Sequence, residues 1–302
     1  MNFFKKWKEN HKYPIIFLNS KGFFKCLPDK MVLKLLFSAR AKYKLNLKNP
    51  QTFNEKLQWL KLYDRKPIYT TMVDKYAVKK YVADIIGEEY IIPTLGVWDK
   101  FDDIDFDKLP NQFVLKCTHD SGGLVIVKDK TELNKKFAKK KIENCLKRDY
   151  YIYNREWPYK NVPRKIIAEQ YMEDTETQEL RDYKFFCFNG EVKALFIASD
   201  RGNPKEETKF DFYDENFNHL PFTNGHPNAT KEIVKPKSFE KMKELASILS
   251  KGIPHLRVDF YEIDGRIYFG ELTFCHWSGL MPFNPEEWDY TFGNWLKLPE
   301  IK

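Results

Sequence analysis

The sequence predicts an α+β fold in which antiparallel hairpins stand between separate helices. Two dipeptides that favour tight hairpin turns, Asn189-Gly190 and Asp264-Gly265, each join two apolar segments. Helical periodicity occurs in isolated stretches, so the regular strand–helix alternation of a parallel sheet is not expected. The chain has 302 residues and is 42% hydrophobic, which allows one large domain or two ordinary ones and excludes intrinsic disorder.

Apolar spacing predicts the elements of the first half of the chain. Residues 1–66 have the pattern of short helices, one of which begins near Asp29 with lysines along one face. Residues 70–86 should form a helix, because apolar side chains recur at helical spacing and Gly87 ends the run. A lysine-rich amphipathic stretch predicts a helix over residues 132–148. Short apolar runs predict strands over residues 90–92, 96–98, 113–117, 124–127 and 165–171.

Two hairpins and a helix are expected in the second half. The first hairpin pairs residues 183–188 with 192–198 around Asn189-Gly190. A helix is expected over residues 238–249. The second hairpin then pairs residues 255–261 with 266–272 around Asp264-Gly265.

Positive charge is concentrated at the N-terminal end. Residues 1–48 hold eleven lysines and Arg40 against only Glu9 and Asp29, a net charge of +10. The whole chain carries +8, so the rest of it carries −2. A protein that coats nucleic acid is basic over its binding domain, and we expect no nucleic-acid partner. Residues 1–48 are either an ordinary solvated surface or a peripheral contact with an anionic membrane or acidic glycan.

Other features favour a cytoplasmic protein. No apolar run approaches the roughly 18–20 residues that a membrane span needs, and no secretory signal is expected. The five cysteines show no CxxC motif and no close spacing, which favours reduced thiols over a disulfide framework or a zinc site.

A lysine and a small-residue loop form the first candidate site. Lys116 lies in an expected strand, and the loop that follows contains Thr118, His119, Ser121, Gly122 and Gly123. Glycine and serine permit the tight backbone that turns N–H groups toward an anion, and a lysine ammonium neutralises phosphate charge. Alone, a strand–SGG–strand unit is also typical of a plain hairpin.

Two acids on the second hairpin form the second candidate site. If its loop has three residues, 264–266, Asp259 lies opposite Glu271 and Arg257 opposite Thr273, all on one face. A two-residue Asp-Gly turn would shift the register by one and place the acids on opposite faces. Adjacent carboxylates repel, so the first register favours a divalent cation bound together with phosphate oxygens. The alternative is a solvent-exposed acidic pair.

The end of the strand over residues 165–171 is a weaker candidate. An apolar strand that reaches Glu169, Gln170 and Tyr171 and then leaves the core, with Asp174 after it, can offer backbone groups to a purine edge. A plain strand end is the alternative. Lys184 opens the next strand and is either a phosphate ligand or a solvated surface lysine.

Taken together and in this order, these segments resemble the ATP-grasp superfamily and, within it, the TupA-like ATP-grasp proteins linked to teichuronopeptide and capsular polysaccharide synthesis. The resemblance covers the chain from near Thr52 to the C-terminus. Six motifs carry it: Asp74-Lys75-Tyr76; Leu109 through Lys116 with the Thr-His-Asp-Ser-Gly after it; Glu156-Trp-Pro-Tyr159; Pro163-Arg through Glu169-Gln-Tyr; Asp182-Tyr-Lys-Phe; and Arg257-Val-Asp-Phe-Tyr through Phe269-Gly-Glu-Leu-Thr-Phe.

The resemblance implies an ATP-grasp fold, with two α+β subdomains that clasp ATP behind a basic helical N-terminal region. The implied segments are residues 1–66, the N-terminal region; 67–112, the first part of the core; 113–172, a lid with the phosphate loop; and 173–302, the subdomain with the metal site. ATP and Mg²⁺ are the implied cofactors.

Residue roles also follow from the resemblance. Lys75 and Lys116 would hold ATP phosphates with Lys184, and the loop of Thr118, His119, Ser121, Gly122 and Gly123 would close over them. Glu169, Gln170 and Tyr171 would form the adenine hinge, and Asp174 would meet the ribose. Asp259 and Glu271 match Mg²⁺ ligands, and Thr273, where many members carry Asn, would offer a hydroxyl. The expected catalytic residues are Arg257, Lys184 and Arg201.

The implied reaction is ATP-dependent carboxylate–amine ligation through an acyl phosphate. An amino acid would supply the amine, and a uronic-acid-type sugar of a surface polysaccharide would supply the carboxylate. The alternatives are a kinase of a sugar or polyol and a non-catalytic binding module of a polysaccharide assembly complex. His119, His226 and His276 are the remaining candidates for proton transfer, with structural or substrate-contacting roles as the alternatives.

Overall fold

The computed structural model describes residues 3–41, 43–174, 180–199, 206–230 and 233–300. Within them the predicted α+β class is confirmed: two antiparallel sheets are combined with ten α-helices. No helix in the described part of the chain has the length and apolar character needed to cross a membrane.

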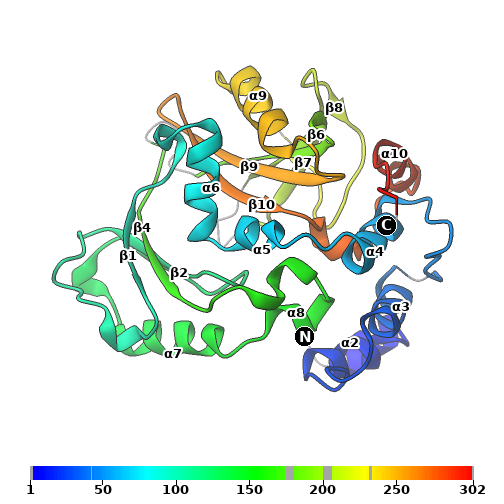
Figure 1. Cartoon of the computed structure of the whole chain (residues 1–302), viewed down its shortest axis with the longest axis horizontal. Coiled ribbons are helices and arrows are strands. Elements are labelled where there is room, and N and C mark those ends of the chain that lie inside the picture. Colours follow the sequence, from blue (N-terminus) through cyan, green and yellow to red (C-terminus); the bar gives the residue numbers. More distant parts are fainter. Residues whose placement is uncertain (1–2, 42, 175–179, 200–205, 231–232, 301–302) are drawn as a thin grey trace.

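Figure 1 shows the arrangement of these elements along the chain. The helices are α1 (Phe3–Glu9), α2 (Tyr13–Ser20), α3 (Asp29–Arg40), α4 (Phe53–Tyr63), α5 (Ile68–Val73), α6 (Ala77–Ile86), α7 (Lys135–Leu146), α8 (Tyr150–Asn154), α9 (Phe239–Ser250) and α10 (Glu287–Trp295). The strands are β1 (Thr94–Trp98), β2 (Phe113–Cys117), β3 (Leu124–Val127), β4 (Ile166–Gln170), β5 (Asp182–Phe188), β6 (Glu191–Ser199), β7 (Lys209–Asp214), β8 (His219–Leu220), β9 (Leu256–Ile263) and β10 (Arg266–Thr273).

The larger sheet has six strands in the order β10-β9-β5-β6-β7-β8. Every residue of its central strand β5 is buried, because side chains alternate between two hydrophobic cores. Phe185 and Cys187 enter the core that contains side chains of α5, α6 and α9, whereas Phe186 and Phe188 enter the core that contains side chains of α4 and α10. The sheet is therefore a rigid layer between two cores.

The smaller sheet has four strands in the order β1-β4-β2-β3. Its apolar side chains pack with Ala138, Ile142 and Cys145 of α7. β1 lies within the expected segment 67–112 but pairs with β4, so the expected boundary at residue 112 divides this sheet. In Figure 1, α5 and α6 lie between the two sheets.

The helices expected within residues 1–66 are α1 to α4. A capping box begins α4, since the Thr52 hydroxyl accepts from the Glu55 N–H and the Glu55 carboxylate accepts from the Thr52 N–H. Helix α3 buries Val32, Leu36 and Phe37 in a small core that also contains Leu280. The N-terminal helices are thereby joined to the C-terminal part of the chain.

Two expected elements of the first half are wrong. The helix expected over residues 70–86 is broken into α5 and α6, because the Asp74 carboxylate accepts from the Tyr76 N–H at 2.9 Å and turns the chain there. The strand expected over residues 90–92 is a 3-10 turn, Glu88–Tyr90, followed by a single bridge from Ile91 to Phe269 of β10.

The second hairpin pairs Asp259 with Glu271 as expected, but it does so with a two-residue turn and a β-bulge. Asp264 and Gly265, with φ values of 49° and 75°, form a two-residue turn, so of the two alternatives for this loop the shorter one forms. A β-bulge between Phe269 and Glu271 shifts the register back by one residue. The expected pairing of Asp259 with Glu271 is therefore confirmed.

Candidate active site

A cavity of about 180 Å³ lies between the two sheets. Its wall combines four lysines, two carboxylates of the larger sheet, the small-residue loop and an apolar side. The residues that line it include Lys75, Lys79, Lys116 and Lys184; Asp182, Glu271 and Glu169; Ser121, Gly122 and Gly123; and Ile91, Ile92, Tyr261 and Phe269.

The break between α5 and α6 positions Lys75. Its backbone N–H donates to the Thr118 carbonyl at 3.0 Å, and its ammonium donates to the Asp120 carbonyl at 2.8 Å. Lys75 is thus held against the loop that joins β2 and β3. The turn at Asp74, which interrupts the helix expected over residues 70–86, therefore places Lys75 at the cavity.

The loop after β2 splits into an anchoring part and a part that lines the cavity. The Thr118 hydroxyl donates to the Pro163 carbonyl at 2.6 Å and accepts from the Lys165 N–H at 3.0 Å. The His119 ring is buried, and its Nε2 lies 3.2 Å from the Arg148 carbonyl. Neither Thr118 nor His119 lines the cavity, so both hold the loop to its own subdomain.

Two glycines shape the cavity side of this loop. Gly122 has φ +106°, which favours glycine. A Cβ at Gly123 would collide with the sulfur of Cys145, and it would lie 3.3 Å from the sulfur of Cys117. Gly123 is therefore required for the close approach of the loop to α7.

Glu169 joins two lysines at the cavity wall. Its carboxylate lies 2.5 Å from the ammonium groups of both Lys79 and Lys116. Burial raises the pKa of Glu169, but the charges of Lys116 and Lys79 outweigh burial and keep that pKa below its ordinary value. The two lysines thus face the cavity on either side of one carboxylate.

The rest of the expected hinge lies beyond the cavity. The Gln170 N–H donates to the Pro93 carbonyl at 3.0 Å, and the Tyr171 ring lies under the Lys128 ammonium, 5.4 Å from it. The Asp174 carboxylate accepts from the Asp264 N–H at 3.0 Å and so meets the β9–β10 turn. Glu169 is the hinge residue that lines the cavity.

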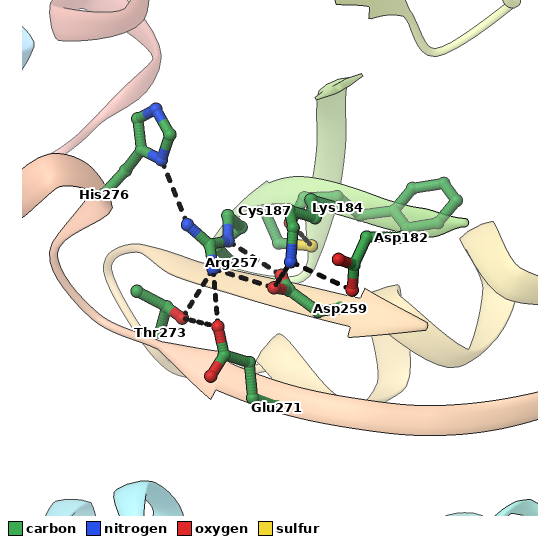
Figure 2. A network of polar contacts seen from close by, with 9 residues as sticks. Asp182, Lys184, Cys187, Arg257, Asp259, Glu271, Thr273 and His276 are labelled. Atoms are coloured by element: carbon green, nitrogen blue, oxygen red, sulfur yellow. Dashed lines mark hydrogen bonds and ion pairs between the residues drawn. The ribbon is translucent and has the colours of Figure 1, made fainter. Parts of the chain in front are cut away.

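A charged network covers one face of β5, β9 and β10 (Figure 2). Asp259 is completely buried, and Arg257 donates to both of its oxygens at 2.7 Å. The Lys184 ammonium pairs with Asp259 and lies 3.2 Å from Asp182. Each acid of the network contacts a cation, which is required when charges are buried.

Glu271 and Thr273 complete the network on β10. Arg257 Nη2 donates to the Glu271 carboxylate and to the Thr273 hydroxyl, both at 2.9 Å. Burial raises the pKa of Glu271, but Lys184, Arg257 and Lys75 outweigh burial and lower that pKa to about 2. The side chain is 43% exposed, so Glu271 presents an ionised carboxylate to the cavity at any physiological pH.

His276 acts as a fixed neutral support for Arg257. Arginine can only donate, so the His276 Nδ1 accepts from Arg257 at 3.0 Å, and its Nε2 donates to the Asn224 side-chain oxygen at 3.0 Å. Burial and the nearby cations lower the pKa of His276 far below its ordinary value. His226 packs against Phe210 and Trp277.

The donor set suits a hard cation shared with a ligand. Asp259 and Glu271 offer carboxylate oxygens on one face, the donor type that Mg²⁺ prefers. Within the described residues no three His, Cys, Asp or Glu side chains form a metal cluster by themselves. Arg257 and Lys184 already contact Asp259, so a cation held here needs Glu271 and oxygens supplied by a phosphate ligand.

Sequence reasoning missed two features of the site. Lys79 follows Lys75 by four residues, a spacing that could have indicated one helix face. Its pairing with Glu169, however, depends on the position of β4 in the smaller sheet. The second feature is a buried network beside the loop after β10. There the Ser278 hydroxyl donates to Glu156 at 2.7 Å, and the Lys61 ammonium donates to the Ser278 carbonyl at 2.7 Å. The expected catalytic residue Arg201 lies outside the described residues.

Comparison with known proteins gives one family match over most of the chain. The model of the family described as TupA-like ATPgrasp matches residues 55–297. No curated protein sequence matches the chain.

Several solved structures are similar at low identity. D-alanine–D-alanine ligase from Bacillus anthracis, complexed with ATP, shares 18% identity, with 67% of this chain and 55% of that chain covered and a TM-score of 0.39. The same ligase from Helicobacter pylori shares 16%, with coverages of 82% and 68% and a TM-score of 0.44. ATP-grasp ligase PsnB, complexed with its minimal precursor, Mg and ADP, shares 11%, with coverages of 73% and 57% and a TM-score of 0.40. The chain thus spans little more than half of the Bacillus anthracis enzyme and of PsnB.

Proposed function

This chain belongs to the TupA-like ATP-grasp family, and we propose that it is an ATP- and Mg²⁺-dependent carboxylate–amine ligase. The observation that carries the proposal is the convergence of four lysines from both halves of the molecule on one cavity, beside the paired acids Asp259 and Glu271. Clustered ammonium groups next to carboxylates that can share a divalent cation are suited to a nucleoside triphosphate.

The cavity wall contains apolar side chains that suit the base of a nucleotide and lysines that suit its phosphates. Ile91, Ile92 and Phe269 form an apolar side suited to a purine, and Glu169 lies at the end of β4 where an adenine amino group can donate to it. Lys75 and Lys116 also line the cavity and would neutralise the charge of the phosphates. The cavity of about 180 Å³ is smaller than the roughly 300–1,000 Å³ of typical ligand sites, so a nucleotide would enter only if part of the wall moved outward, and the loop at Ser121–Gly123 is the segment that we propose for this movement.

The proposed reaction has two steps. The carboxylate of the acceptor attacks the γ-phosphorus of ATP and gives an acyl phosphate and ADP. The amine then attacks the acyl carbon, the amide bond forms, and inorganic phosphate leaves with the loss of one proton from the amine. The protein supplies position and charge and forms no covalent bond of its own.

Named side chains have matching roles in this scheme. Lys184 and Arg257 bring positive charge to the face where the phosphoryl group transfers, and His276 keeps Arg257 in place. Bound Mg²⁺, held by Asp259 and Glu271, would neutralise phosphate charge there. The glycine loop would exclude water from the acyl phosphate.

The finer proposal concerns the substrates. The link of the TupA-like family to teichuronopeptide and capsule synthesis supports a uronic-acid-type sugar as the carboxylate donor and an amino acid as the amine. A cytoplasmic location is consistent with the use of ATP and with five free cysteines, four of them buried.

The proposal is tested by measuring ADP and phosphate release with uronic acids and amino acids, singly and in pairs, followed by mass analysis of the product. Ligation predicts turnover that needs both partners and an amide product. A stable phosphorylated sugar formed without an amine would favour a kinase instead.

A binding measurement tests the nucleotide site separately. Lys116→Ala should weaken ATP binding at least roughly tenfold, because a direct charge-assisted contact is lost. Lys147→Ala, an exposed lysine in the same subdomain, is the matched control. Failure of the unaltered protein to bind ATP with Mg²⁺ would contradict the proposal.

A further inference from the structure

The first helices present apolar side chains to solvent in the same region that carries the positive charge. Within residues 1–34, seven exposed lysines accompany exposed large apolar residues, although such residues are normally buried. We call these side chains the N-terminal surface. The lysines are Lys5, Lys8, Lys12, Lys21, Lys25, Lys30 and Lys34. The apolar residues, with their exposed fractions, are Trp7 (44%), Phe17 (38%), Leu18 (36%), Phe23 (75%) and Met31 (50%).

The most exposed aromatic residue lies on an ordered turn between α2 and α3. Gly22, with φ +76°, turns the chain, and Phe23 follows between Lys21 and Lys25. The neighbouring Phe24 is anchored to the rest of the protein, because its backbone carbonyl accepts from Arg155 Nη2 at 2.7 Å. The turn therefore presents an exposed apolar ring that two exposed lysines flank in the sequence.

Acidic residues do not neutralise this surface. Residues 1–48 contain only two acids, Glu9 and Asp29. The Asp29 carboxylate is already engaged on the side of the protein body, where Arg65 donates to it at 2.7 Å and the Tyr151 hydroxyl at 2.6 Å. The acids of residues 1–48 therefore leave most of the positive charge of this segment without compensation.

The N-terminal helices have a fixed orientation relative to the cavity subdomains. Asn19 donates to the Tyr153 carbonyl at 2.6 Å, which ties α2 to α8. Helix α3 shares a core with Leu280, in the segment that follows β10. In Figure 1, α2 and α3 lie together at one edge of the molecule. A partner bound by the N-terminal surface would therefore orient the whole protein.

We propose that the N-terminal surface docks the protein on a bilayer that contains anionic lipid. The lysines complement the lipid phosphates, and Phe23 with its apolar neighbours enters the interface between headgroups and acyl chains. An acidic polysaccharide would satisfy the lysines but offers no apolar phase for Phe23, so the exposed apolar side chains favour lipid. The docking is independent of the proposed ligase activity, because it needs neither ATP nor a sugar.

The test is co-sedimentation of the full chain, without nucleotide, with phosphatidylcholine vesicles that contain or lack phosphatidylglycerol. Binding should need phosphatidylglycerol and should weaken as salt is raised. Lys21→Glu with Lys25→Glu should lower the partition coefficient by more than roughly 30-fold, since the loss of each lysine near the surface contributes about a fivefold effect and each new glutamate is also repelled by the anionic lipid. Phe23→Ser should lower it roughly tenfold.

Matched controls come from α7, which has an exposed Phe137 beside Lys135 and Lys136. Phe137→Ser and the Lys135→Glu, Lys136→Glu pair should leave vesicle binding within about twofold of the unaltered protein, because they change the same chemistry elsewhere. Thermal unfolding of each variant verifies that the fold is retained.

Three results would overturn the proposal. One is equal binding to neutral and anionic vesicles. A second is an equal loss in the α7 controls, which would assign binding to any lysine-flanked aromatic residue. The third is binding to an anionic polysaccharide, such as polygalacturonate, that exceeds vesicle binding and is unchanged by Phe23→Ser.

Discussion

Replacing Glu271 by glutamine tests the candidate active site with the least disturbance to the fold. The change removes one negative charge and keeps the size of the side chain. Glu271 contacts Arg257 at 2.9 Å and is 43% exposed. Its pKa of about 2 means that the carboxylate is fully ionised at neutral pH, so the substitution removes a whole charge from the cavity.

The structure indicates that this substitution costs little stability. A pKa lowered from 4.5 to about 2 corresponds to about 3 kcal/mol, and solvent screening of a side chain that is 43% exposed reduces this to about 1 kcal/mol. The amide oxygen can still accept from Arg257. Asp259 differs, because it is completely buried between Arg257 and Lys184, and Asp259→Asn should cost about 3–5 kcal/mol. Glu271→Gln therefore separates chemistry from folding.

The expected loss of turnover is much larger than the loss of stability. Removal of one preorganised group that stabilises transferring charge lowers kcat by roughly a hundred- to a thousandfold. The assay is ADP release at saturating ATP and Mg²⁺, together with urea unfolding of the same preparation. Glu262→Gln is the matched control, because Glu262 is a half-buried carboxylate on the same hairpin that accepts from Ser238.

The reasoning is refuted if Glu271→Gln retains turnover within about threefold of the unaltered protein, or if Glu262→Gln loses as much. Either result would remove Glu271 from the proposed cation site.

Three further predictions concern the surroundings of the site. Burial raises the pKa of Asp289 to about 6. Proton binding to Asp289 therefore stabilises the fold fully below pH 3.8, and this stabilisation is lost as the pH rises through 6. Relative to the unaltered protein, Asp289→Asn should gain up to about 3 kcal/mol of stability between pH 4 and pH 8 in urea unfolding, and a constant difference would contradict this. Gly123→Ala should cost about 1–3 kcal/mol by overpacking against Cys145, measured by thermal unfolding, and an unchanged Tm would show that the loop has room. His276→Phe should cost about 1–3 kcal/mol in urea unfolding, because Arg257 Nη1 loses its acceptor. It should leave the pH profile of turnover unchanged in shape, and loss of an ionisation from that profile would indicate proton transfer by His276.

Local signals predicted much of the fold. Asn189-Gly190 and Asp264-Gly265 both form two-residue turns with positive φ at both positions, as their small or polar side chains allow. The lysine-rich helix expected over residues 132–148 is α7, Lys135–Leu146, whose Ala138 and Ile142 are buried as an amphipathic pattern requires.

The pairing of Asp259 with Glu271 shows where local signals are insufficient. The turn alone would place the acids on opposite faces, and the bulge at Gly270 restores them to one. Ile267, Phe269 and Leu272 all lie in one hydrophobic core. The spacing between these core residues changes from two residues to three, because the bulge adds one residue to the strand. Packing of that core against the helices decides between the registers, and the Asp264-Gly265 turn by itself does not contain that information.

The sequence by itself therefore determined the α+β class, the elements with strong local patterns and the residue types available for phosphate and cation chemistry, because turns and amphipathic faces depend on neighbouring residues. Only the tertiary structure decided which of those residues meet. The Asp74 turn brings Lys75 to the loop, and Lys79 pairs with Glu169 across two subdomains. Such contacts join residues far apart in the chain, and their geometry follows from the packing of two sheets rather than from local preference.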